Sequence, residues 1–189
     1  MASGVRRIAA VAALSTAAAL AVAATPAGAL TFTRCAAGSS FRCARLAVPL
    51  DRSGGVAGTV SLFVERRPAT IGAPRGTVLA LAGGPGQAAT PLTADFVSVL
   101  GPALRTRDLI VLDQRGTGKS GLLRCSGLEG LDTRPDASPA EVAAAGEACA
   151  NTLGSARAHY ATIDSVEDIE ALRQALGAPR LTLYGTSYG

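Results

Sequence analysis

The residue with the clearest capacity for chemistry is Ser187, at the centre of the closing run 185–189, Gly-Thr-Ser-Tyr-Gly. This run is a G-x-S-x-G pattern, and it directly follows the short apolar run 181–184, which predicts a strand. A strand that turns sharply into a helix strains its turn residue, and flanking glycines leave room where backbone meets backbone. The pattern therefore predicts a serine nucleophile that is exposed at the carboxyl end of a sheet.

Two further turns follow predicted strands. The first is 83–86, Gly-Gly-Pro-Gly, whose backbone N–H groups suit an oxyanion hole. The second is 113–120, Asp-Gln-Arg-Gly-Thr-Gly-Lys-Ser. Together with 185–189, these turns make three motifs that follow one another along the chain. The three together indicate a particular fold family more specifically than any one of them does.

The elements that must position these turns are short strands separated by helices. The glycine-rich run 53–58 predicts a hairpin, so we expect the first two strands to be antiparallel neighbours. The later strands are separated by segments long enough for helices, which predicts parallel pairing. The predicted strands are 45–48, 59–65, 77–82, 109–112 and 181–184, and the predicted helices are 91–104, 139–153 and one that begins after residue 165.

The last of these helices leads to the strand before the serine. Ser165 and Asp168 resemble a capping box at its start, and the run 177–179, Gly-Ala-Pro, ends it. Helical spacing predicts one apolar face, formed by Val166, Ile169, Leu172 and Leu176.

Counted along the chain, Ser187 follows the fifth predicted strand, where the α/β-hydrolase fold carries its nucleophile. The three motifs and the run 160–189 resemble the secreted tripeptidyl aminopeptidases and the related prolyl aminopeptidases. The resemblance extends from Val-Pro-Leu-Asp at 48–51 to the end of the chain. The family often has a histidine or an asparagine–proline pair before Gly-Gly-Pro-Gly, whereas this chain has Leu81-Ala82. The expected fold class is α/β, the N-terminal part of an α/β-hydrolase fold.

The resemblance implies a serine hydrolase that acts by acyl transfer. Ser187 resembles the nucleophile, the amides of Gly84 and Tyr188 the oxyanion donors, and Gly185 and Gly189 the glycines of the nucleophile turn. The expected activity is release of tripeptides or N-terminal residues from peptides, with no cofactor, metal or nucleic acid. An esterase or lipase is the alternative, because these enzymes use the same turn. No pattern in the sequence specifies an oligomeric state.

The acid–base partners of Ser187 are expected beyond the printed sequence. In this fold the triad runs Ser, Asp, His along the chain, and the one histidine, His159, precedes Ser187. We therefore expect His159 to be a solvated surface residue. We also expect the chain alone to be unstable and inactive, because the strand before Ser187 would be an unpaired sheet edge. A noncatalytic exported fragment is the corresponding alternative.

Residues 1–29 have the pattern of a signal peptide. Arg6 and Arg7 precede an apolar, alanine-rich stretch, and Ala-Gly-Ala at 27–29 predicts cleavage after Ala29. A membrane anchor is disfavoured because the stretch is shorter than the ~20 residues that a spanning helix needs. Cleavage leaves residues 30–189 as one domain, the truncated catalytic domain, and lowers the net charge from +4 to about +2. We expect a secreted protein that does not bind the membrane, and the twin-arginine route stays open.

Four cysteines lie in the expected exported portion, which favours two disulfides. Short loops favour Cys35 with Cys43 and Cys125 with Cys149, and four free thiols are the alternative.

Two phosphate-binding hypotheses arise from the glycines. The first, a dinucleotide fingerprint, places Asp113 29 residues beyond Gly84 instead of about 20. The second, a P-loop ending at Ser120, requires a glycine where Asp113 stands.

Overall fold

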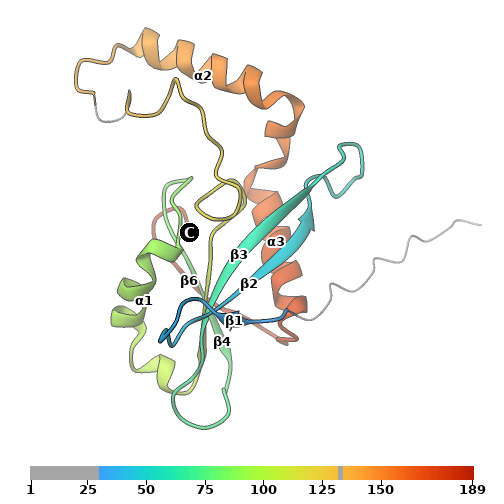
Figure 1. Ribbon diagram of the computed structural model, residues 1–189, viewed down its shortest axis with the longest axis vertical. Helices are drawn as coiled ribbons and strands as arrows, with labels where there is room; N and C mark the ends of the chain where they lie inside the picture. Colours follow the sequence, from blue (N-terminus) through green and yellow to red (C-terminus); the bar gives the residue numbers. More distant parts are fainter. Residues whose placement is uncertain (1–29, 132–133) are drawn as a thin grey trace, which may run out of the picture.

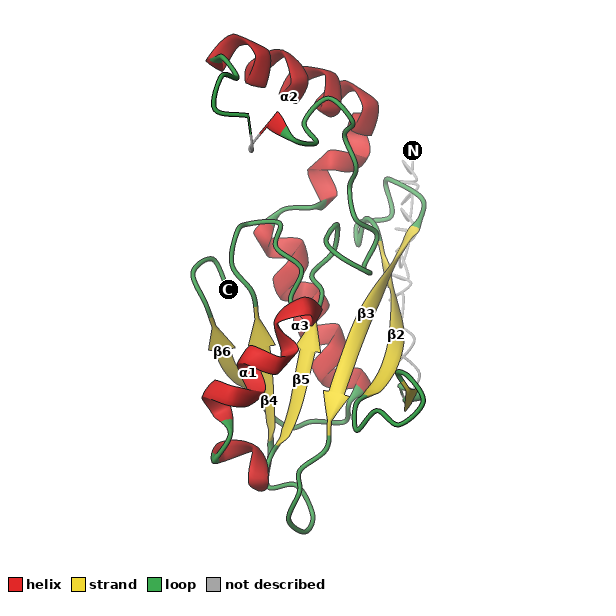
Figure 2. Ribbon diagram, turned by 60° about the vertical axis from the view of Figure 1, so that its left-hand side comes forward, coloured by secondary structure: helices red, strands yellow, loops and turns green. Residues whose placement is uncertain are grey.

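The computed structural model describes residues 30–131 and 134–189, so the predicted signal peptide lies outside the described residues. The strands are β1 (Thr33–Arg34), β2 (Arg42–Pro49), β3 (Thr59–Arg67), β4 (Thr77–Leu81), β5 (Asp108–Leu112) and β6 (Thr182–Gly185), and the helices are α1 (Thr93–Leu100), α2 (Pro139–Leu153) and α3 (Thr162–Ala175). The strands form one mixed sheet in the order β1-β2-β3-β5-β4-β6, with α1 on one face and α3 on the other (Figure 1, Figure 2).

The strand directions confirm the pairing that the sequence predicts. β2 and β3 form an antiparallel hairpin, and β5, β4 and β6 are parallel to one another. β3 joins the two groups by antiparallel pairing with β5. The sequence does not indicate β1, because its two polar residues carry no apolar alternation. Ser187 therefore follows the sixth strand of the structure, which is the fifth of the predicted set.

The apolar runs fill both faces of the sheet because successive side chains of a strand point in opposite directions. In β4, Leu79 packs in the cluster that contains Leu172 of α3, whereas Val78 packs in the cluster that contains Phe96 of α1. Each of these four side chains is at most 4% exposed. The fold is therefore a three-layer sandwich, and its central parallel strands are buried on both faces.

Helix α3 begins at Thr162, earlier than the sequence predicts, and the predicted capping box is wrong. The N-cap is Ala161, whose amide donates to Asp164 Oδ2 at 3.0 Å. Ser165 and Asp168 instead lie inside the helix and are buried. The apolar face is also narrower than predicted, because Val166 is 53% exposed.

The other two helices agree more closely with the sequence. α1 occupies the middle of the predicted segment 91–104 and is flanked by 3₁₀ turns. Pro102, which has no N–H to donate, directly follows its C-cap residue, Gly101. The predicted helix 139–153 is confirmed as α2, with Ser138 and Glu141 forming a reciprocal capping box. α2 has no buried residue and lies beyond the carboxyl ends of β4, β5 and β6 (Figure 2). No helix in the described part of the chain is long and apolar enough to cross a bilayer.

Two disulfides close local loops. One joins Cys35 to Cys43 across the β1–β2 turn, and the other joins Cys125, in the loop after β5, to Cys149 of α2. These are the pairs that loop length favours. Among the described residues, β6 pairs with β4 alone and forms the sheet edge that the sequence predicts, with Leu183 59% exposed.

α3 carries one buried and one exposed apolar residue, Leu172 and Val166, whose substitutions test how the helix packs. Leu172→Ala is expected to lower the free energy of unfolding by about 2–5 kcal/mol, because it opens a cavity in the core. Val166→Ala, on the exposed side of the same helix, is expected to change it by less than about 0.5 kcal/mol. Urea denaturation of both variants, each made in the longer product that is expected to continue beyond Gly189, measures the difference. Equal losses would contradict the packing of α3 described here.

Candidate active site

Ser187 stands in a strained turn directly after β6. Its φ angle is 56°, and it is the one residue other than glycine with a positive φ in the described part of the chain. A non-glycine residue in this region costs about 1–3 kcal/mol, so the surrounding structure must hold it there. Two backbone hydrogen bonds do so: Thr186 N donates to Leu81 O at 3.2 Å, and Gly189 N donates to Thr186 O at 3.1 Å. Ser187 itself is exposed.

The two glycines of the turn lie where backbone segments pass in close contact. A Cβ atom on Gly185 would overlap the carbonyl group of Gly189. A Cβ atom on Gly189 would lie 2.7 Å from the carbonyl oxygens of Leu81 and Ala82, at the end of β4. Real Cβ atoms do not approach backbone oxygens this closely, so both positions require glycine for steric reasons. The role in a nucleophile turn that the sequence assigns to Gly185 and Gly189 stays a prediction.

The Gly-Gly-Pro-Gly turn lies against the serine. A Cβ atom on Gly83 would lie 3.0 Å from Ser187 Cβ and 3.3 Å from Thr186 O. The amide of Gly83 donates to Gln87 Oε1 at 3.2 Å. In the described residues, by contrast, the amides of Gly84 and Tyr188 have no hydrogen-bond partner, as an oxyanion hole requires. Gln87 is a site residue that the motif alone does not indicate.

Asp113 fixes this turn from the neighbouring strand. Its side chain is fully buried at the end of β5, and Oδ1 accepts hydrogen bonds from the amides of Ala89 and Thr90 at 2.9 and 2.8 Å. Oδ2 accepts from Lys119 N at 2.9 Å and from Thr90 Oγ1 at 3.1 Å. One carboxylate thus joins the segment after Gly-Gly-Pro-Gly to its own turn, 113–120. Because its oxygens are occupied by these donors, Asp113 does not fit the ribose-binding role of a dinucleotide fingerprint.

The other end of the 113–120 turn is fixed by Ser120. Its hydroxyl donates to Asp113 O at 2.6 Å and accepts from Phe63 N of β3 at 2.7 Å. Gly118 lies in this turn with a φ of 44°, and a Cβ there would overlap the Asp113 carboxylate. The glycines and the serine of Gly-Thr-Gly-Lys-Ser therefore close a turn around a carboxylate, and they do not form a phosphate-binding loop.

Arg115 joins the same turn to the helix that precedes the nucleophile. Its side chain is fully buried, and Nε and Nη2 donate to the two oxygens of Asp168 in α3, both at 2.7 Å. Nη1 donates to the carbonyl oxygens of Leu50 and His159 at 3.0 and 2.7 Å. Burial opposes the charge, but the hydrogen bonds and the negative charge of Asp168 raise the pKa of Arg115 above its ordinary value. The bidentate geometry orients α3 against the turn.

Two further contacts border the nucleophile turn. Tyr188 Oη lies 2.7 Å from Thr162 Oγ1 at the start of α3, in hydrogen-bonding contact. His159 is less exposed than the sequence predicts: its side chain is 20% exposed, and Nδ1 lies 3.9 Å from Asp51 Oδ1. No hydrogen bond joins His159 to Ser187 within the described residues. The structure therefore brings the glycine-rich turns to Ser187, but it directs the histidine ring to Asp51.

One group of potential metal ligands lies away from Ser187. Cys35, Cys43 and Glu65 have their ligand atoms within 4.8 Å of one another. Both cysteines belong to one disulfide, so neither offers the thiolate that binds a metal.

Comparison with known proteins agrees with this arrangement. Residues 76–189, more than half of the chain, match the alpha/beta hydrolase fold family. The chain therefore belongs to the α/β-hydrolase fold family. The matched segment begins just before β4 and contains all three motifs.

The relatives are named as peptidases. The chain is 25% identical over 166 residues to a tripeptidyl aminopeptidase of Streptomyces coelicolor, covering 79% of the chain and 31% of the relative. It is 29% identical over 162 residues to the serine protease Hip1 of Mycobacterium tuberculosis, covering 78% of the chain and 31% of the relative. The chain thus spans about a third of the length of these relatives.

The role of Asp113 is testable by a change that keeps its shape. Asp113→Asn is expected to lower the free energy of unfolding by about 1–3 kcal/mol, because an amide nitrogen replaces an acceptor among buried donors. Asp136→Asn is the control, since Asp136 is 77% exposed and pairs with the exposed Arg134. Urea denaturation of the two variants of the longer product compares them. Equal stability of both variants would contradict the structural role of Asp113.

The lowered pKa of Asp51 predicts how the stability of the fold changes at acidic pH. The pKa of Asp51 is lowered from 3.8 to about 2, chiefly by hydrogen bonds from the Ser53 hydroxyl, although burial opposes this shift. Hydrogen bonds from the amides of Ser53 and Val56, and the charge of His159, contribute to lowering the pKa in the same direction. Its contribution to stability is therefore full above pH 3.8 and is lost as the pH falls towards 2. The stability difference between the wild type and Asp51→Asn should shrink over that interval. A difference that is independent of pH would refute this assignment.

Proposed function

We propose that this chain carries the nucleophile and the oxyanion hole of a secreted serine peptidase of the aminopeptidase type. One observation carries the proposal: Ser187, held at positive φ after β6, lies against the Gly-Gly-Pro-Gly turn. A serine in this position is exposed to substrate and lies next to backbone N–H groups that have no other partner in the described residues. These are the two parts that acyl transfer requires from this region of the fold.

The reaction follows from these groups. Ser187 Oγ attacks the peptide carbonyl carbon, and the amides of Gly84 and Tyr188 donate hydrogen bonds to the oxygen that becomes negatively charged. A histidine takes the serine proton and passes it to the leaving amine, so the C–N bond breaks and an ester to Ser187 forms. Water then hydrolyses the ester and releases the N-terminal fragment of the substrate. Loss of one oxyanion donor typically costs ~3 kcal/mol of transition-state stabilisation.

The acid–base residues are proposed to lie outside the 189-residue chain. Its one histidine, His159, faces Asp51, and the chain spans about a third of the length of its named relatives. A longer product that continues beyond Gly189 would supply the Asp and the His, in the order that this fold uses. The 189-residue chain alone is then expected to be inactive.

The substrate and the location rest on separate arguments. The names of both relatives support a peptide substrate, and the name of the Streptomyces coelicolor relative supports one with a free N-terminus. Residues 1–29 support export with cleavage after Ala29, and the two disulfides suit an oxidising compartment. N-terminal sequencing of the exported protein tests the cleavage site: a mature protein that begins with Leu30 is expected, and a retained leader would contradict export.

Activity tests the role of Ser187 directly. In the longer product, Ser187→Ala is expected to lower kcat by at least about 10³-fold, because the nucleophile is lost while substrate binding is retained. Ser155→Ala, at an exposed serine far along the chain from the motif, is the matched control and should retain full activity. Release of p-nitroaniline from tripeptide anilides is the measurement. Unchanged turnover in Ser187→Ala would rule out the proposed nucleophile.

The same assay separates the peptidase from the esterase alternative. An aminopeptidase prefers tripeptide anilides with a free amino group and loses activity when that group is acetylated. An enzyme that cleaves p-nitrophenyl esters and is indifferent to acetylation would support the esterase and contradict the aminopeptidase.

A further inference from the structure

Arginines gather at the end of the sheet opposite to Ser187. Arg75 lies two residues before β4, Arg107 directly precedes β5, and Arg180 lies two residues before β6. Parallel strands begin at the same edge of a sheet, so the topology brings these three side chains to one end. Ser187 follows the carboxyl end of β6, and the arginine cluster therefore lies outside the site described above.

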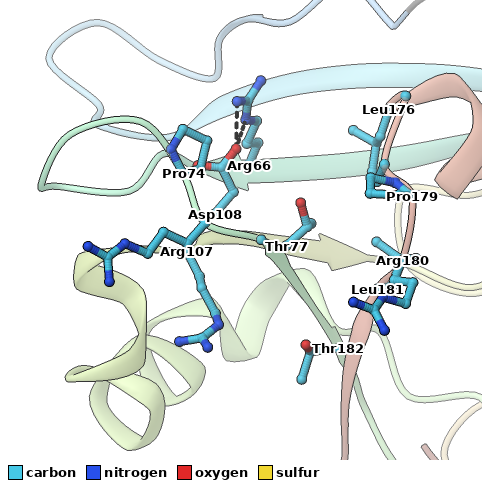
Figure 3. Close-up of a pocket in the computed structure, with 14 residues that line it drawn as sticks. Arg66, Pro74, Thr77, Arg107, Asp108, Leu176, Pro179, Arg180, Leu181 and Thr182 are labelled. Carbon is cyan, nitrogen blue, oxygen red and sulfur yellow. Dashed lines mark hydrogen bonds and ion pairs between the residues drawn. The ribbon is translucent and has the colours of Figure 1, made fainter.

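A cleft of about 650 Å³ opens among these arginines (Figure 3). Its charged lining consists of Arg66, Arg75, Arg107, Arg180 and Asp108, four positive charges against one negative charge, a net of +3. The remaining lining comes from the strand starts and from the turn 176–179 after α3. A volume between about 300 and 1,000 Å³ is typical of sites for small ligands.

The charges in this cleft are unbalanced. Asp108 is 5% exposed, and its two oxygens already accept hydrogen bonds from Arg66 and from the amide of Ala69. Figure 3 shows this pair on one side of the cleft and Arg180 across from it. In the described part of the chain, the guanidinium groups of Arg75, Arg107 and Arg180 have no hydrogen bond and no ion pair.

We propose that this cleft binds a phosphate-bearing anion through Arg75, Arg107 and Arg180. A guanidinium group presents a planar fork of donors that matches two oxygens of one phosphate, so three such groups around one cleft select multivalent phosphate over a single carboxylate. The phosphate belongs to a soluble ligand or to a lipid headgroup, since both present the same oxygens. This site is independent of the proposed function, because it shares no residue with the nucleophile turn.

Calorimetric titration of the longer product with inorganic tripolyphosphate, and its sedimentation with phosphatidylglycerol vesicles, test the two sources. Arg107→Ala/Arg180→Ala is expected to weaken binding about 100-fold, roughly tenfold for each charge-assisted contact. Arg180→Lys keeps the charge but loses the fork and should weaken binding less than Arg180→Ala. Arg124→Ala/Arg134→Ala removes the same net charge at exposed positions away from the cleft and should bind as the wild type does. Peptide hydrolysis by the longer product should be the same in all variants.

Chemical protection gives a test that needs no variant. Phenylglyoxal modifies accessible arginines, and bound tripolyphosphate is expected to protect Arg75, Arg107 and Arg180 but not Arg124. Binding that is lost equally in both double variants, or the absence of both binding and protection, would overturn the proposal. Binding by the 189-residue chain but not by the longer product would also overturn it, because later residues would then occupy the cleft.

Discussion

The turn at Ser187 depends on backbone segments that approach too closely for a side chain. Gly185 and Gly189 meet each other, and Gly189 meets the end of β4, at distances that exclude a Cβ atom. This contact turns the chain back over the sheet and keeps Ser187 at positive φ, where its side chain is exposed. The neighbouring turn at Gly83 then lies directly against the serine. The candidate site is therefore a consequence of steric limits at three glycines.

Two buried ionic side chains connect the turns around Ser187 to the rest of the fold by hydrogen bonds. Asp113 holds the segment after Gly-Gly-Pro-Gly through amide donors, and Arg115 holds α3 through both oxygens of Asp168. Buried charges are stable only when their hydrogen bonds are satisfied, so each must be matched by fixed partners. The Asp-Gln-Arg-Gly motif thus has a structural role, and it positions the helix and the turn on either side of Ser187.

The sequence predicts the parts of this fold that depend on local patterns. Short apolar runs locate five strands, the segments between them predict the strand directions, and the segment 139–153, rich in alanine and glutamate, locates α2. The predictions are wrong where a residue's role is set by a contact with a residue distant in the sequence. Asp168 resembles a helix cap in the sequence, but its partners are Arg115, 53 residues away, and Arg52. Likewise, no local signal indicates that the turn contains Gln87 as a hydrogen-bond partner of Gly83, or that His159 faces Asp51.

The most direct test of the account is covalent labelling of the longer product with a fluorophosphonate. The serine oxygen displaces fluoride from phosphorus, and peptide mapping by mass spectrometry locates the new phosphonate ester. One adduct, on Ser187, is expected to form in the folded enzyme and not after denaturation. An adduct on another serine, or continued peptide hydrolysis with Ser187 unmodified, would contradict it.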